Sequence, residues 1–104
     1  MHADIDQKRD ALAVLCRRYG VARLEIFGSA ARAADFDALH SDADFLVTFT
    51  PATRNDLAAF ADFKEALEGL LGRRVDLVER EAIEASRNFI RRRAILKEAE
   101  MVYG

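Results

Sequence analysis

An apolar strand with two aspartates at its start decides the fold of this chain. Residues 41–49 read Ser-Asp-Ala-Asp-Phe-Leu-Val-Thr-Phe. Because side chains alternate between the two faces of a strand, Asp42 and Asp44 point the same way. The opposite face is apolar and predicts contact with a hydrophobic core, through Ala43, Phe45, Val47 and Phe49. One face therefore holds the core, and the other presents a pair of carboxylates.

Helices and strands alternate along the rest of the chain. Apolar residues at helical spacing predict three helices, over residues 4–19, 56–71 and 82–98, with a break near Ser86 in the last. Asn55 is the expected N-cap of the second helix, and Gly72 ends it. One side of that helix is expected to carry Leu57, Phe60, Phe63, Leu67 and Leu70. The remaining elements are strands over 23–27 and 74–79, a short helix over Ser29–Ala34 and a short terminal strand over 101–103.

This pattern predicts one domain over residues 1–104, with the order α-β-α-β-α-β-α. Few strands and long helices favour a small sheet covered mainly on one face. The long helix between the second and third strands allows either a parallel crossover or a mixed sheet.

Composition narrows the class of protein. The net charge is −2, and this chain lacks the basic excess typical of nucleic-acid binders, which disfavours direct nucleic-acid binding. The one cysteine, Cys16, excludes an internal disulfide and lies among apolar helix positions, as expected for a buried thiol. No stretch reaches the ~20 apolar residues of a membrane span, and the first residues do not resemble a signal peptide. We therefore expect a cytoplasmic protein that does not bind membranes.

Three aspartates form the candidate metal site. Asp42 and Asp44 share a strand face, and Asp76 interrupts the apolar third strand. An ionised carboxylate in a buried strand costs several kcal/mol unless it is paired or metal-bound. Oxygen-only acidic sites suit Mg²⁺, and two such ions can clamp a phosphoryl or nucleotidyl transfer. The alternative for each aspartate alone is a turn cap or an ion pair with a neighbouring arginine.

A candidate phosphate site precedes the aspartates. Gly28 allows close approach of a phosphate, and Ser29 begins a helix whose free N–H groups attract anions. Arg32 lies one turn further on and could contact a triphosphate or a partner's acidic surface, or could simply be solvated. The cluster Arg91–Arg93 is most simply a solvated helix face, with contact to RNA or a partner as the alternative. Triads, zinc ligands, a P-loop and a dinucleotide fingerprint are all missing from the sequence.

Together these motifs resemble the minimal nucleotidyltransferases of the DNA polymerase beta superfamily. The resemblance rests on Gly28-Ser29, on the Asp-x-Asp of Asp42 and Asp44, and on Asp76 in the third strand. It implies an α+β fold with a mixed, mainly antiparallel sheet of three to four strands. It also implies that Gly28, Ser29 and Arg32 hold the triphosphate of ATP. The three aspartates would bind two Mg²⁺ ions, and Asp76 would help to deprotonate the attacking hydroxyl.

The resemblance also implies a partner. Minimal nucleotidyltransferases of this type often pair with a HEPN-domain toxin, and can transfer AMP from ATP to a tyrosine of that toxin. An antitoxin that acts by adenylylation is therefore the expected function. The alternative is a non-catalytic antitoxin that neutralises its partner by binding. An enzyme acting on RNA ends is a weaker third option because a broad basic surface is missing. The acceptor could be held by the partner protein or at a homodimer surface.

Overall fold

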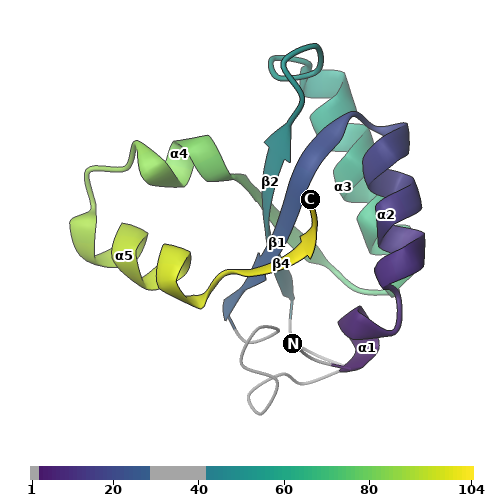
Figure 1. Ribbon diagram of the computed structural model, residues 1–104, viewed down its shortest axis with the longest axis horizontal. Coiled ribbons are helices and arrows are strands. Elements are labelled where there is room, and N and C mark those ends of the chain that lie inside the picture. The colour runs from purple at the N-terminus through teal and green to yellow at the C-terminus, as the bar shows by residue number, and fades with distance from the viewer. Residues whose placement is uncertain (1–2, 29–41) are drawn as a thin grey trace.

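Two antiparallel strands, β1 (Val21–Phe27) and β2 (Ala43–Phe49), form the centre of the sheet. The computed structural model in Figure 1 describes residues 3–28 and 42–104. The strand β3 (Val75–Glu79) pairs in parallel with β2, and β4 (Glu100–Tyr103) pairs antiparallel with β1. The spatial order is β3-β2-β1-β4. The predicted α+β class with a mixed, mainly antiparallel sheet is therefore confirmed, and so is the short terminal strand.

Three helices cover one face of the sheet, which we call the core face. They are α1 (Ala3–Asp6), α2 (Arg9–Arg18) and α3 (Leu57–Leu71). Their buried side chains pack against the apolar set of β2, as predicted, in a cluster that includes Ile5, Leu12, Cys16, Phe45, Phe63 and Leu67. The single helix expected over 4–19 was wrong, because Lys8 leaves helical geometry. Its Nζ instead donates to the Leu70 carbonyl at 3.0 Å, which ties the start of α2 to the end of α3.

The N-terminus of α3 differs from the prediction in two details. Asp56, not Asn55, caps the helix, and its carboxylate accepts a hydrogen bond from the Ala59 N–H at 3.0 Å. Leu57 was expected on the buried side but is 85% exposed, whereas Phe63 is fully buried. The first turn of α3 therefore extends beyond the core. Gly72 ends the helix in the left-handed conformation, as expected.

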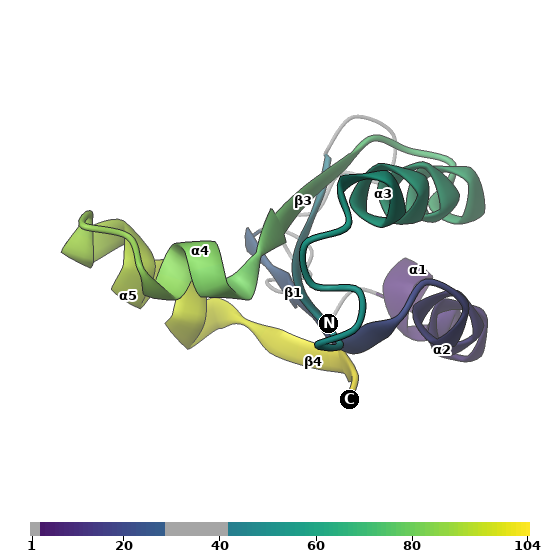
Figure 2. The same cartoon turned by 90° about the horizontal axis from the view of Figure 1, so that it is seen from above.

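Two further helices contact the other face of the sheet, which we call the carboxylate face. They are α4 (Arg80–Glu84) and α5 (Phe89–Glu98), so the predicted helix over 82–98 does break near Ser86. A small apolar cluster joins them to the strands through Phe27, Leu46, Ile83 and Ile95. Figure 2 shows α1, α2 and α3 on one side of the sheet and α4 and α5 projecting from the other. The larger core lies on one face, as predicted, but helices contact both.

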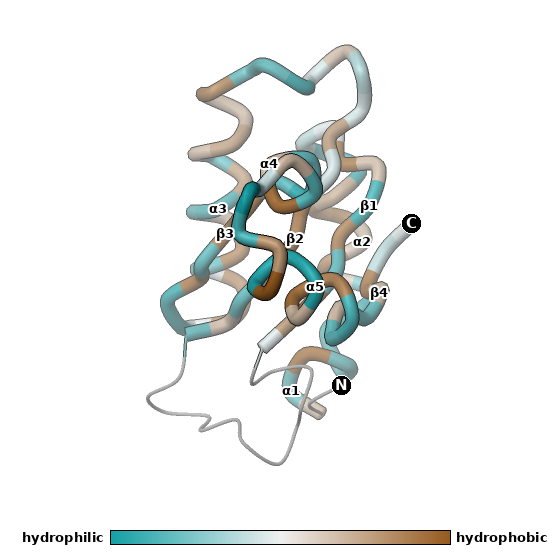
Figure 3. The backbone as a smooth tube through the Cα atoms, turned by 90° about the vertical axis from the view of Figure 1, so that its left-hand side faces the viewer, coloured by the Kyte–Doolittle hydropathy of each residue, from teal (hydrophilic) through white to brown (hydrophobic). Residues whose placement is uncertain are grey.

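Hydropathy along the backbone follows this division. In Figure 3 the strand β2 is mostly hydrophobic, whereas α4 and α5 mix hydrophobic and hydrophilic residues. Within the two described segments, no helix combines the length and the apolar character needed to cross a bilayer.

Candidate active site

Strand pairing brings two of the three predicted aspartates together. Asp44 on β2 lies directly opposite Asp76 on the parallel strand β3. Residues paired across a sheet direct their side chains to the same face, and here it is the carboxylate face. On the other side of β2, Asp44 pairs with Phe27 at the end of β1. The end of β1 and the starts of β2 and β3 therefore meet at one point.

Gly28 follows β1 and approaches the Asp44 carboxylate closely. Its φ is +68°, a left-handed conformation that glycine adopts readily. A Cβ atom added at this position would lie 2.6 Å from Asp44 Oδ2. The glycine is therefore required both by the backbone and by the position of the carboxylate.

The three aspartates differ in exposure. Asp42 precedes β2 and is exposed, Asp44 is half-buried, and Asp76 is exposed. Asp76 lies on an outer strand, so the expectation that burial would force it to find a partner was wrong. Across residues 3–28 and 42–104, no three carboxylate, imidazole or thiol groups are gathered closely enough to hold a metal ion. The carboxylate oxygens of Asp44 and Asp76 fit the ligand chemistry of Mg²⁺, and the three-aspartate centre stays a prediction.

The predicted phosphate site is only partly visible. Gly28 lies beside Asp44, as described above. Ser29, Arg32 and the short helix expected over Ser29–Ala34 lie outside the described residues. Their predicted contacts with a triphosphate stay predictions.

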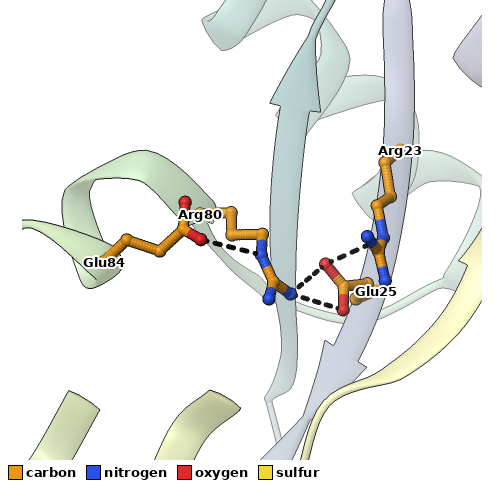
Figure 4. A network of polar contacts seen from close by, with 4 residues as sticks. All are labelled: Arg23, Glu25, Arg80 and Glu84. Carbon is orange, nitrogen blue, oxygen red and sulfur yellow. Dashed lines mark hydrogen bonds and ion pairs between the residues drawn. The ribbon is translucent and has the colours of Figure 1, made fainter.

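Sequence reasoning missed a buried ion pair on the carboxylate face. Glu25 on β1 is 3% exposed, and Nη1 of Arg80 donates to both of its carboxylate oxygens at 2.7 Å (Figure 4). Nε of Arg23 lies 3.4 Å from the same carboxylate, and Nε of Arg80 lies 3.5 Å from Glu84. The hydrogen bond to Glu25 raises the pKa of Arg80 further above its usual range. The guanidinium therefore stays charged at any physiological pH.

This ion pair borders the paired aspartates. Glu25 lies opposite Leu46, two residues along β2 from Asp44, and so on the same face. The signal available in the sequence was the alternation of β1, which directs Glu25 away from Leu24 and Ile26. The partner could not be found that way, because it requires knowing that Arg80 begins a helix packed against the neighbouring strands β2 and β3.

The three arginines of the cluster Arg91–Arg93 have different surroundings. Arg91 and Arg93 are exposed, in keeping with the simpler interpretation of a solvated helix face. Arg92 is half-buried, donates to the Ser86 carbonyl at 3.1 Å and lies over the Phe89 ring at 5.7 Å. One of the three arginines therefore stabilises the turn before α5.

A small mixed sheet whose strand ends bring a glycine and two aspartates together is the arrangement of a nucleotidyl-transfer domain. The sequence matches the nucleotidyltransferase domain family over residues 8–100. The chain belongs to this family, and it is therefore a nucleotidyltransferase by class. Enzymes of this class use a nucleoside triphosphate and a divalent metal ion.

Solved structures agree with this assignment. One, described as a minimal nucleotidyltransferase, has 37% sequence identity and a TM-score of 0.72, and the match covers 96% of this chain and 97% of that one. A toxin–antitoxin complex with AMP-PNP shares the fold at 19% identity and a TM-score of 0.66, over 92% of this chain and 73% of that one. The tri-AMPylated Shewanella oneidensis HEPN toxin in complex with MNT antitoxin shares the fold at 18% identity and a TM-score of 0.62, over 96% of this chain and 72% of that one. No curated protein matches the sequence.

Proposed function

We propose that this chain transfers AMP from ATP to a hydroxyl group, in a reaction that depends on Mg²⁺. The acceptor is a tyrosine of a HEPN-type toxin, so the chain acts as an antitoxin by adenylylation. The observation that carries the proposal is the pairing of Asp44 with Asp76 beside Gly28, in a chain of the nucleotidyltransferase family.

The chemistry is a displacement at the α-phosphorus of ATP. The acceptor oxygen forms a bond to this phosphorus, the bond to the β-phosphate bridging oxygen breaks, and pyrophosphate leaves. Asp76 accepts the proton of the attacking hydroxyl. Gly28, lacking a side chain, lets the phosphates approach the carboxylates closely. Asp42, Asp44 and Asp76 would hold Mg²⁺, which would neutralise charge on the phosphates when bound.

The neighbouring complexes support the choice of partner. One neighbour is a toxin–antitoxin complex with AMP-PNP, and another contains an AMPylated HEPN toxin. These proteins share the fold with the present chain. The transfer of their partner and reaction to this chain is our proposal.

Label transfer tests the proposal. The purified chain is incubated with Mg²⁺, α-labelled ATP and a HEPN-type partner protein. We expect label on the partner, and the double variant Asp42→Asn/Asp44→Asn should reduce labelling by at least about 100-fold through lost transition-state stabilisation. Asp62→Asn, an exposed aspartate on α3, is the matched control and should label normally.

Two outcomes would change the assignment. Labelling that persists in the double variant means that these aspartates do not carry the reaction. If labelling is lost but the double variant still neutralises the toxin in cells, the chain is a binding antitoxin instead. This second function would fit the toxin–antitoxin complexes among its structural neighbours.

A further inference from the structure

The outer edge of β3 carries backbone groups that point away from the sheet. The Arg74 carbonyl faces β2, where it accepts a hydrogen bond from the Ala43 N–H at 3.0 Å. The Val75 N–H faces the opposite way and donates to Glu68 Oε2 at 3.0 Å. Successive residues of a parallel strand alternate between their two neighbours. The N–H groups of Leu77 and Glu79 therefore also point outward, at a position that no described strand covers.

A groove lies directly beside these outward-facing groups, and we call it the β3 groove. Its volume is about 570 Å³, within the usual range for ligand sites. Leu77, Val78 and Glu79 line it from the strand, and Leu57 and Phe60 line it from α3. Leu57 is the most exposed large apolar side chain among the described residues, at 85%. The groove thus combines an open strand edge with an exposed apolar wall.

The β3 groove lies next to the paired aspartates along the strand β3. Asp76 immediately precedes Leu77 on the same strand, and its side chain points to the carboxylate face. A peptide paired with the edge of β3 would place the residue opposite Asp76 on that same face. The residues before and after it would point to the side of Leu57 and Phe60. One strand could therefore present a hydroxyl to the carboxylates and anchor itself in the groove.

Charge around the groove favours a basic occupant. Asp56 and Glu79 line it, and Asp76 lies at the next position of β3. The one cation in its lining, Arg54, pairs with Glu81 at 2.9 Å. The net charge of this region is therefore negative, which attracts a positively charged segment.

We propose that the β3 groove binds the acceptor of the partner protein as an added β-strand. The bound segment is extended and basic, with apolar residues on both sides of the hydroxyl-bearing residue. Main-chain hydrogen bonds to Leu77 and Glu79 supply affinity, and the apolar wall supplies specificity. This inference rests on the proposed function, because it places the acceptor hydroxyl beside Asp76.

Two peptides of identical composition test the pattern. The probe is Lys-Ser-Leu-Tyr-Leu-Ser-Lys, whose leucines flank tyrosine and would enter the groove. The control is Lys-Leu-Ser-Tyr-Ser-Leu-Lys, in which the leucines move to the other face of a strand. We expect the probe to bind at least about fivefold more tightly, since apolar burial is lost in the control. Binding of the probe should change the NMR chemical shifts of the Leu77 and Glu79 amides.

Glu79→Pro tests the main-chain contact. Glu79 has φ −70°, which suits proline, and its outward N–H is not part of the pairing with β2. We expect probe binding to weaken about tenfold through the lost hydrogen bond. Glu79→Ala keeps the N–H and should weaken binding about twofold at most, through lost charge attraction.

Leu57→Ser tests the apolar wall. It keeps the groove proposal testable if the Glu79→Pro variant does not fold. Binding should weaken about fivefold. Val14→Ser removes an exposed apolar side chain from α2 and should leave binding unchanged. Equal binding of the two peptides, or full binding by Glu79→Pro and Leu57→Ser, would overturn the inference. So would shifts of the Leu77 and Glu79 amides on concentrating the protein alone, because a second copy would then fill the groove.

The two proposals can fail separately. Peptide binding is measured without ATP or Mg²⁺, so it does not depend on catalysis. If the peptide binds but no label is transferred, the adenylylation proposal is contradicted and the groove proposal stands. If label is transferred to the partner and neither Leu57→Ser nor Glu79→Pro changes that transfer, the groove proposal is contradicted and the adenylylation proposal stands.

Discussion

The two faces of the sheet bury different kinds of side chain. The core face is apolar and aromatic, with Phe45 of β2 and Phe63 and Leu67 of α3 fully buried. The carboxylate face has a small apolar cluster, and next to it lie the Glu25–Arg80 ion pair and the aspartates. The same strands build both faces because their side chains alternate. Stability is therefore concentrated on one face, which leaves the other free to carry polar chemistry.

The largest expected effect comes from truncating the aromatic centre of the core face. Phe63 is fully buried. The centroid of its ring lies 5.9 Å from the ring centroid of Tyr19 and 6.3 Å from that of Phe49. Phe63→Ala should lower the free energy of unfolding by about 3–5 kcal/mol, because it leaves a cavity. Chemical denaturation measures this loss.

The matching change on the carboxylate face should cost less. Ile95 is 8% exposed and belongs to the smaller cluster. Ile95→Ala should cost about 2 kcal/mol, at the low end for such truncations. A loss equal to that of Phe63→Ala would show that the two faces contribute equally, against the contrast drawn above.

The next effect comes from the ion pair on the carboxylate face. Glu25→Ala leaves the Arg80 guanidinium partly buried without its carboxylate. Because the Arg80 side chain is 23% exposed, we expect a loss of about 2–3 kcal/mol, less than for a fully buried pair. Thermal or chemical unfolding measures it.

A surface ion pair provides the control for this change. Asp6 and Arg9 lie 2.8 Å apart, and both side chains are about half exposed. Asp6→Ala should cost no more than about 0.5 kcal/mol. If Glu25→Ala costs equally little, the buried pair does not fasten α4 to the sheet.

The sequence predicted the core face better than the carboxylate face. Alternation in β2 and helical spacing around Phe63 report burial directly, because they need only local geometry. The approach of Asp44 to Asp76 followed from two strands carrying aspartates near their starts. The family resemblance added the mixed, mainly antiparallel sheet.

The features that the sequence did not predict depend on how distant parts of the chain are placed relative to one another. Exposure of Asp76 follows from the place of β3 at the sheet edge, and no spacing rule reveals which strand is outermost. Leu57 has helical spacing to Phe60, yet it lies beyond the end of the core. The Glu25–Arg80 contact joins residues 55 positions apart. Each of these needs the topology before local patterns can be interpreted.

Two glycines allow the close contact at the candidate site to be measured. Gly28 and Gly72 have nearly equal φ values of +68° and +65°. A Cβ at Gly28 would meet Asp44, whereas one at Gly72 would meet nothing within 4 Å. Gly72→Ala should cost about 1 kcal/mol through backbone strain, and Gly28→Ala about 2 kcal/mol because a clash is added. Equal losses would mean that the Asp44 carboxylate moves aside freely.

The smallest effect concerns a thiol within the core face. Burial raises the pKa of Cys16 from 9.0 to about 12. Between these values the unfolded chain loses the thiol proton while the folded chain keeps it, so stability falls as pH rises. The thiol should contribute a loss of about 1 kcal/mol between pH 9 and pH 10. Cys16→Ala is the control: it lowers stability overall through the lost side chain but should lack this part of the pH dependence. Parallel curves of unfolding free energy against pH for the two proteins would mean that Cys16 ionises equally in the folded and unfolded chains, and that the core face is open to water at α2.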